Sequence, residues 1–195
     1  RVGFGAKPGY GGNMCGICGF VSRRGITAEE LGRMNDTMYH RGPNDSGEEI
    51  YPIRNGYQVG LAQRRLSIMD LSPLGHQPMH SANGRISVVY NGEIYNYQEL
   101  KKELKNHKFK TNSDTEVLVH GYEEWGHDLL NKLRGMFAFC IYDKNKNELF
   151  IARDHFGIKP LYYYQNKEGF LFASEIKSFL EIPFFHKKLN KEMLG

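Results

Sequence analysis

The chain has 195 residues and a formal net charge of +4, from 26 Lys and Arg against 22 Asp and Glu. This length suits a single domain, and 25% charged with 40% hydrophobic residues is typical of a globular protein. Acidic and basic residues alternate along the chain, which argues against a nucleic-acid partner. No apolar run reaches the roughly 18–20 residues of a membrane helix, so no membrane association is expected.

The first 13 residues, RVGFGAKPGYGGN, are rich in Gly and have no hydrophobic period. They predict a disordered leader or an upstream extension, and they lack the apolar stretch of a secretory signal. The domain itself is expected to cover residues 14–195. Three cysteines, Cys15, Cys18 and Cys140, form an odd set that favours a reduced, cytoplasmic protein over a disulfide scaffold.

Apolar and β-branched runs separated by turn-forming residues predict the strands in chain order. These strands are expected over residues 15–21, 48–53, 57–68, 85–90, 136–142, 148–153, 161–164 and 170–173. Between them, residues 40–47 are dense in turn formers, Arg54-Asn55-Gly56 is a turn, and residues 70–79 hold two prolines and predict a long loop.

Helical patterns lie mainly in the middle of the chain. Thr27 and Glu30 form a capping box that opens a helix ending near residue 39, and Asn96 is expected to cap a helix ending near residue 106. Further helices are predicted over residues 116–125, 127–133 and 174–180. Strands come first, helices follow and strands return, which indicates an α+β fold of antiparallel sheets with helices on their outer faces.

The pair Met14-Cys15 has the strongest chemical potential in the chain. If Met14 is removed, Cys15 carries both a thiol and a free α-amine, and the amine can act as base for its own side chain. Cys15 and Cys18 also form a C-x-x-C motif. A structural zinc site would need a second such pair, a redox motif would lie at a strand-to-helix junction, and a plain buried cysteine pair is the third alternative.

Seven motifs occur in order: MCGICGF, HRGPNDSG, RLSIMDLSPLGHQPM, YNGEIYN, TNSDTE, GMFAFCIYD and RDHFGIKPLYY. Together they resemble the glutaminase domain of class II (N-terminal nucleophile) glutamine amidotransferases, specifically of glutamine-hydrolysing asparagine synthetases. The resemblance covers residues 14–180. It implies a four-layer αββα sandwich of two antiparallel sheets, the fold of Ntn hydrolases, and hydrolysis of glutamine to glutamate and ammonia.

The resemblance also assigns the bond-making groups. Cys15 corresponds to the nucleophile, and the Asn91 side chain with the Gly92 backbone N–H corresponds to the oxyanion hole. An Asn donor is uncharged at every pH, and Gly allows close backbone approach. The alternative for Asn91-Gly92 is a hairpin turn, for which this dipeptide is a strong signal.

For the substrate, Arg65 corresponds to the residue that binds the glutamine carboxylate, with Leu66 and Ile68 following it in the binding segment. Asp114 corresponds to the acid that pairs with the ammonium group, and Glu93 lies near the same amine. A guanidinium matches a planar carboxylate by bidentate pairing. Two alternatives remain, a surface arginine at Arg65 and a helix cap at Asp114.

The segment His40-Arg41-Gly42 corresponds to a loop near the nucleophile that helps to close the pocket, with Arg41 in a structural role. Residues 153–163 are interpreted mainly as a fold signature. No metal site is expected, and the histidines at 76, 107 and 127 are predicted to be surface or loop residues.

The chain departs from the family pattern at Gln63, where many members have His, and at Asn44, where Asp is usual. With residues 1–14 attached, Cys15 also lacks its free amine. Asparagine synthetases continue into an ATP-pyrophosphatase domain, which is absent from this sequence. No cofactor is therefore expected for the glutaminase domain, and ATP and Mg²⁺ only for that synthetase domain.

The implied partners are glutamine, the synthetase domain and, as an open question, a second copy in a homodimer. Relatives that amidate a sugar acid or a cell-wall carboxylate, or that close a lactam ring, remain an alternative. So does a non-catalytic glutamine-binding or assembly module in which the Cys15 amine stays blocked.

Overall fold

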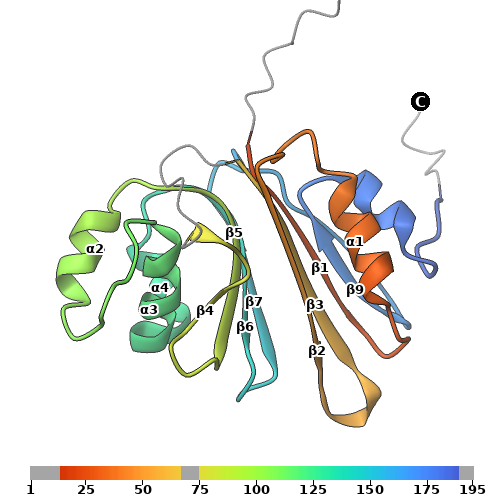
Figure 1. The fold of residues 1–195 in the computed structure, drawn as a ribbon, viewed down its shortest axis with the longest axis horizontal. Helices are drawn as coiled ribbons and strands as arrows, with labels where there is room; N and C mark the ends of the chain where they lie inside the picture. Colours follow the sequence, from red (N-terminus) through yellow and green to blue (C-terminus); the bar gives the residue numbers. More distant parts are fainter. Residues whose placement is uncertain (1–13, 67–74, 189–195) are drawn as a thin grey trace, which may run out of the picture.

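The computed structural model describes residues 14–66 and 75–188 (Figure 1). Two antiparallel sheets lie face to face, and helices cover the outer face of each. The predicted α+β class and αββα sandwich are confirmed. The leader predicted over residues 1–13 lies outside the described residues. None of the helices in the described ranges is long and apolar enough to cross a membrane.

The first sheet has five strands. Their spatial order is β2 (Asp45–Pro52), β3 (Gln58–Arg65), β1 (Gly16–Ser22), β9 (Gly169–Ala173) and β8 (Tyr162–Asn166). The turn between β2 and β3 is the short 3₁₀ helix η1 (Arg54–Gly56), where Asn55 has φ +64° and Gly56 has φ +76°. Asn and Gly tolerate this left-handed conformation best, so the predicted turn is confirmed.

Two helices cover the outer face of the first sheet. Helix α1 (Ala28–Asp36) begins with the predicted Thr27–Glu30 capping box. It ends at Asp36 and not near residue 39, because the next backbone hydrogen bonds, from Met38 to Asn35 and from Tyr39 to Asp36, span only three residues and tighten the chain into turns. The last predicted helix is the 3₁₀ helix η4 (Ile176–Glu181).

The second sheet has four strands in the order β4 (Met79–His80), β5 (Ile86–Ile94), β6 (Gly135–Asp143) and β7 (Glu148–Arg153). Its outer face is covered by α2 (Tyr97–Glu103), α3 (Thr115–Trp125), η3 (Gly126–Asp128) and α4 (Leu129–Lys132) (Figure 1). The sequence did not predict β4. Two residues are too few to produce a periodic pattern, and they pair with Val88 and Ser87 in the fold.

Asn96 does not cap α2 with its side chain, so that prediction was wrong. Its amide nitrogen donates to the Lys132 carbonyl at 2.9 Å, and its amide oxygen accepts from the Arg134 N–H at 2.9 Å. Both polar ends of the side chain are therefore used to join the start of α2 to the segment that enters β6.

The period of two along the strands sorts side chains into three apolar layers. On β1, Cys18 and Phe20 pack toward α1, whereas Ile17 faces the core between the two sheets. On β5, Tyr90 packs toward the helices and Val89 faces the inter-sheet core. Asn91 follows two residues after Val89, so the alternation directs its side chain between the sheets.

Candidate active site

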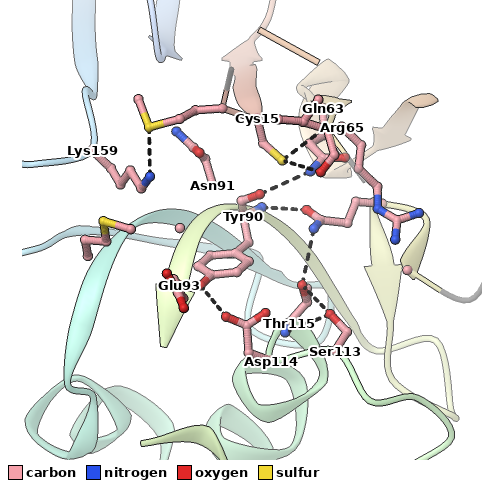
Figure 2. Close-up of a pocket in the computed structure, with 16 residues that line it drawn as sticks. Cys15, Gln63, Arg65, Tyr90, Asn91, Glu93, Ser113, Asp114, Thr115 and Lys159 are labelled. Atoms are coloured by element: carbon pink, nitrogen blue, oxygen red, sulfur yellow. Dashed lines mark hydrogen bonds between the residues drawn. The ribbon is translucent and has the colours of Figure 1, made fainter. Parts of the chain in front are cut away.

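A cavity of about 410 Å³ opens beside the start of β1 (Figure 2). It is lined by side chains and backbone of both sheets and of the N-terminal end of α3: Met14, Cys15, Gln63, Arg65, Leu66, Gly75, Gln77, Tyr90, Asn91, Gly92, Glu93, Ser113, Asp114, Thr115, Met136 and Lys159. Seven of the predicted site residues are in this set. Ile68 lies outside the described residues.

Cys15 lies immediately before β1, and its thiol meets the end of β3. The Leu66 N–H donates to Sγ at 3.4 Å, and Sγ lies 3.8 Å from the Leu66 carbonyl oxygen. Burial raises the pKa of the thiol, and the Leu66 N–H and the charges of Arg65 and Lys159 only partly oppose this effect. The thiol is thus mainly protonated at neutral pH and needs a base before it can act as a nucleophile.

Asn91 places a free hydrogen-bond donor in the cavity. Its Nδ2 atom is buried and has no hydrogen-bond partner within the described part of the chain. An unpaired buried donor costs roughly 1–3 kcal/mol, so it is rarely kept without a reason. A ligand oxygen entering the cavity would satisfy it.

The Gly92 N–H points to the same side of β5 as the cavity. Its cross-strand neighbour is Phe137, whose carbonyl accepts from the Asp154 N–H at 2.8 Å and whose N–H donates to the Asp154 side chain at 3.2 Å. The backbone groups of Phe137 therefore point away from Gly92. The N–H groups of Tyr90 and Ile94, which lie two residues before and after Gly92, point away from β6 and donate to the side chains of Gln77 and Asp114. Because backbone groups alternate along a strand, the Gly92 N–H points in the same direction as these two. Asn91 and Gly92 lie inside β5, so the hairpin-turn alternative is wrong.

Arg65 ends β3 as a buried residue with 8% exposure, so the surface-arginine alternative is wrong. Its guanidinium lies against the backbone of Gly75, where an added β-carbon would come within 2.2 Å of Nη2. Asp45 lies 3.9 Å from Nη1. The positively charged guanidinium of Arg65 is therefore held at one side of the cavity.

Asp114 stands at the N-cap position of α3, yet its side chain makes no cap hydrogen bond, so the capping alternative is wrong. Its Oδ2 accepts from the Tyr90 hydroxyl at 2.7 Å (Figure 2). The same oxygen accepts from the Ile94 N–H at 2.9 Å. Burial raises the pKa of this carboxyl, and the two hydrogen bonds partly oppose the rise. The carboxylate is thus held in place as a partner for a cation.

Two glutamine residues connect the elements that form this site by hydrogen bonds, and the sequence did not predict this role for either. Gln63 on β3 donates from Nε2 to the Tyr90 carbonyl on β5 at 3.2 Å, which links the two sheets. Gln77 accepts from the Tyr90 N–H at 2.7 Å and donates to Thr115 Oγ1 at 3.3 Å. None of these hydrogen bonds can be read from the sequence, because the bonded residues are at least 13 positions apart.

Lys159 is a further cavity residue, which the sequence interpretation treated as part of a fold signature. It is buried, with 4% exposure, and its Nζ lies 2.9 Å from the Met14 sulfur. Burial lowers its pKa, and the nearby Cys15 and Glu93 partly oppose this. Nothing in the surrounding sequence, HFGIKP, distinguishes Lys159 from a surface lysine, because its burial is decided by the fold.

The loop residues His40, Arg41 and Gly42 do not line the cavity, but two of them support it. Arg41 donates from Nε to the Cys15 carbonyl at 3.1 Å and pairs with Glu175 at 3.1 Å. Gly42 packs on the backbone of β3, where an added β-carbon would meet the Arg64 carbonyl carbon at 2.5 Å. His40 is exposed, and its Nε2 atom lies 2.9 Å from Glu175 Oε1.

The cavity therefore combines a thiol, a neutral donor pair, a guanidinium and a carboxylate. The donor pair suits an oxygen that becomes negative during attack on a carbonyl. The two opposite charges suit a zwitterionic amino acid. Together they fit an amino acid whose side chain ends in a carbonyl group.

A family model described as a glutamine amidotransferase domain matches residues 14–195. The chain is 48% identical over 188 residues to the glutamine-hydrolyzing asparagine synthetase 2 of Bacillus subtilis, covering 93% of this chain and 24% of that protein. It is 42% identical over 192 residues to a putative glutamine-hydrolyzing asparagine synthetase 2 of Methanocaldococcus jannaschii, covering 91% and 37%. The chain thus spans only a minor part of these relatives.

Among solved structures, the fold is similar to that of glutamine phosphoribosylpyrophosphate amidotransferase from B. subtilis. The TM-score is 0.69 at 23% identity, and the match covers 85% of this chain and 43% of that one. At this identity the similarity concerns the fold, and it agrees with the two-sheet sandwich described above.

Proposed function

Because the chain belongs to the glutamine amidotransferase domain family, we propose that it hydrolyses L-glutamine to glutamate and ammonia through a γ-glutamyl thioester on Cys15. One observation carries the proposal. The Cys15 thiol lines one cavity together with Arg65, Asp114 and Asn91, whose Nδ2 atom has no hydrogen-bond partner among the described residues. In this arrangement Arg65 binds the α-carboxylate and Asp114 binds the α-ammonium, with Glu93 beside it.

The reaction requires a base, since burial keeps the Cys15 thiol protonated. In a chain that begins at Cys15, the α-amine accepts the thiol proton as sulfur attacks the substrate amide carbon. The carbonyl oxygen becomes negative and accepts from Asn91 Nδ2 and the Gly92 N–H. The C–N bond then breaks, the amine returns the proton to the leaving nitrogen, and ammonia departs. Water cleaves the thioester to release glutamate and regenerate the thiol.

Met14 has to be removed for this chemistry, and its position is compatible with removal. Its side chain lines the cavity beside Lys159. Loss of Met14 therefore enlarges the cavity next to the nucleophile.

The whole protein is proposed to pass the ammonia to an activated carboxylate, aspartate in asparagine synthesis, on a C-terminal ATP-pyrophosphatase domain. ATP and Mg²⁺ belong to that domain in this proposal. The 48% identity to a glutamine-hydrolyzing asparagine synthetase supports it. A cytoplasmic location is also proposed, supported by the three free cysteines.

The direct test is a chain processed so that it begins at Cys15, assayed for glutamate and ammonia release from L-glutamine. We expect Cys15→Ala to abolish release. Cys18→Ala is the matched control, because Cys18 is a free cysteine buried on the opposite face of β1 toward α1, and it should retain the activity. Persistent release by Cys15→Ala would disprove the thioester route, and so would trapping of a glutamyl adduct on another residue.

A further inference from the structure

A second polar cluster lies on the outer face of the second sheet, on α3 and the loop that follows α2. His107, His120 and Glu123 each offer one ligand atom, and the three atoms lie within 4.8 Å of one another. His120 and Glu123 are three residues apart on α3, so they share one face of the helix. His107 comes from the segment between α2 and α3, two helices that lie side by side (Figure 1). We propose that this cluster is a site for a zinc-like divalent transition-metal ion.

The geometry is close to what such an ion needs. Nδ1 of His120 lies 3.1 Å from Oε2 of Glu123, and Nδ1 of His107 lies 3.8 Å from the same oxygen. Ligands at the usual zinc bond lengths in a tetrahedron are separated by about 3.3 Å. The three atoms can reach that spacing by small side-chain rotations. Two His and one Glu with an open fourth position for water is a known zinc ligand set.

The other nitrogen of each imidazole already faces a carboxylate. His107 Nε2 lies 3.1 Å from Glu124 Oε2, and His120 Nε2 lies 3.5 Å from Glu116 Oε1. Metal-binding histidines nearly always donate their second N–H to such a group, which orients the ring and makes it a better ligand. A pair of histidines that only formed surface ion pairs would not require this arrangement on both rings.

Burial supplies a second, independent indication. His120 is 8% exposed, and its Nε2 atom has no hydrogen bond within the described ranges, although the Glu116 Oε1 atom lies 3.5 Å away. Binding of a metal at Nδ1 would fix the proton on Nε2 and draw it toward Glu116. The ring is also held by Phe109, which packs edge-on at 4.9 Å between centroids. The site is thus largely preformed.

The environment favours a cation. Three carboxylates, on Glu116, Glu123 and Glu124, surround two imidazoles within the distances given above. Imidazole nitrogen ligands favour zinc, nickel and copper, whereas Mg²⁺ and Ca²⁺ prefer all-oxygen sites. We therefore expect selectivity for the first group.

Binding at this cluster would stabilise one wall of the active-site cavity. His107 lies at the start of the loop that leads to α3. Further along this loop, the N–H groups of Lys110 and Thr111 each donate to the Glu116 carboxylate at 2.8 Å. That loop leads to Ser113 and Asp114 in the cavity. A metal joining His107 to α3 would fasten the loop at its far end. The site itself is independent of the reaction proposed above.

The test uses the full chain, without a polyhistidine tag and in a Cys15→Ala background so that the thiol of the active-site cavity cannot bind metal. The protein is stripped with a chelator and titrated with Zn²⁺ against a chromophoric competitor. We expect one equivalent to bind and the melting temperature to rise. His107→Gln and Glu123→Gln, at two partly exposed positions, should each weaken binding by about tenfold or more.

His127→Gln is the matched control. His127 also pairs with a carboxylate, Glu148 at 2.6 Å, but it has no second histidine in a cluster among the described residues. This variant should bind Zn²⁺ as the parent does, and Mg²⁺ should not compete. The proposal is overturned if less than about 0.2 equivalent binds, if His107→Gln and Glu123→Gln bind as tightly as the parent, or if His127→Gln loses as much affinity as they do.

Discussion

We expect Asn91→Ala to lower activity strongly and to change stability little. A buried Asn that is hydrogen-bonded and lies outside the site should show the reverse. The Nδ2 donor of Asn91 is buried and unpaired among the described residues, so truncation removes an unsatisfied group and breaks no hydrogen bond there. We expect Asn91→Ala to change the free energy of unfolding by less than about 1 kcal/mol. Loss of one oxyanion donor costs about 2.7–4 kcal/mol in the transition state, which lowers kcat by about 100–1,000-fold.

Asn96→Ala is the matched control. This Asn is also buried, but both ends of its amide are hydrogen-bonded, to Lys132 and Arg134. Its loss should destabilise the fold by about 2–3 kcal/mol while kcat stays within about twofold. The assays are glutamate release by a chain beginning at Cys15 and equilibrium unfolding in urea. The oxyanion assignment is refuted if Asn91→Ala keeps kcat within about fivefold, or if its only effect is on KM.

Two further predictions concern substrate binding and the loop packed on β3. Burial raises the pKa of Asp114, so its carboxylate is lost at a higher pH than that of an ordinary Asp. The KM for glutamine should rise as the pH falls through this pKa, and Asp114→Asn should have a high KM with no such dependence. A pH-independent KM in the parent chain would contradict this. Gly42→Ala places a β-carbon 2.5–2.6 Å from the Arg64 and Arg65 backbone and should destabilise the fold by about 1–3 kcal/mol, as measured by urea unfolding. Gly25→Ala, with nothing within 4 Å, should change stability by less than about 0.5 kcal/mol, and equal effects of the two substitutions would refute the packing argument.

Much of the fold could be read from local patterns. The capping box at Thr27 sets the start of α1, and Asn55-Gly56 sets the turn before β3, because each depends on neighbouring residues alone. The strands β6, β7 and β9 follow from β-branched and aromatic runs. The motifs in order also predict Cys15, Arg65, Asn91 and Asp114 as candidate site residues.

Other features depended on contacts between distant residues. Asn96 and Asp114 both occupy N-cap positions, yet their side chains bind elsewhere, because tertiary partners satisfy them better than the helix ends do. Lys159 enters the cavity only because β1 and the segment before β8 meet there. Gln63 and Gln77 were not predicted because each acts through hydrogen bonds to residues of other strands or helices.

By itself, the sequence determined where most strands and turns form, since residue type and period act locally. The two-sheet sandwich and the candidate site residues were implied by the resemblance of the motifs to a known family. The tertiary structure decided the ionisation and the hydrogen bonding of the candidate site groups. Burial raises the pKa of Cys15 and leaves Asn91 Nδ2 without a partner in the described part of the chain, and both effects arise only when the ends of the two sheets come together. The pairing of His107 with His120 and Glu123 likewise depends on how α2 and α3 pack, because nothing in the sequence around His107 indicates which helix face it will meet.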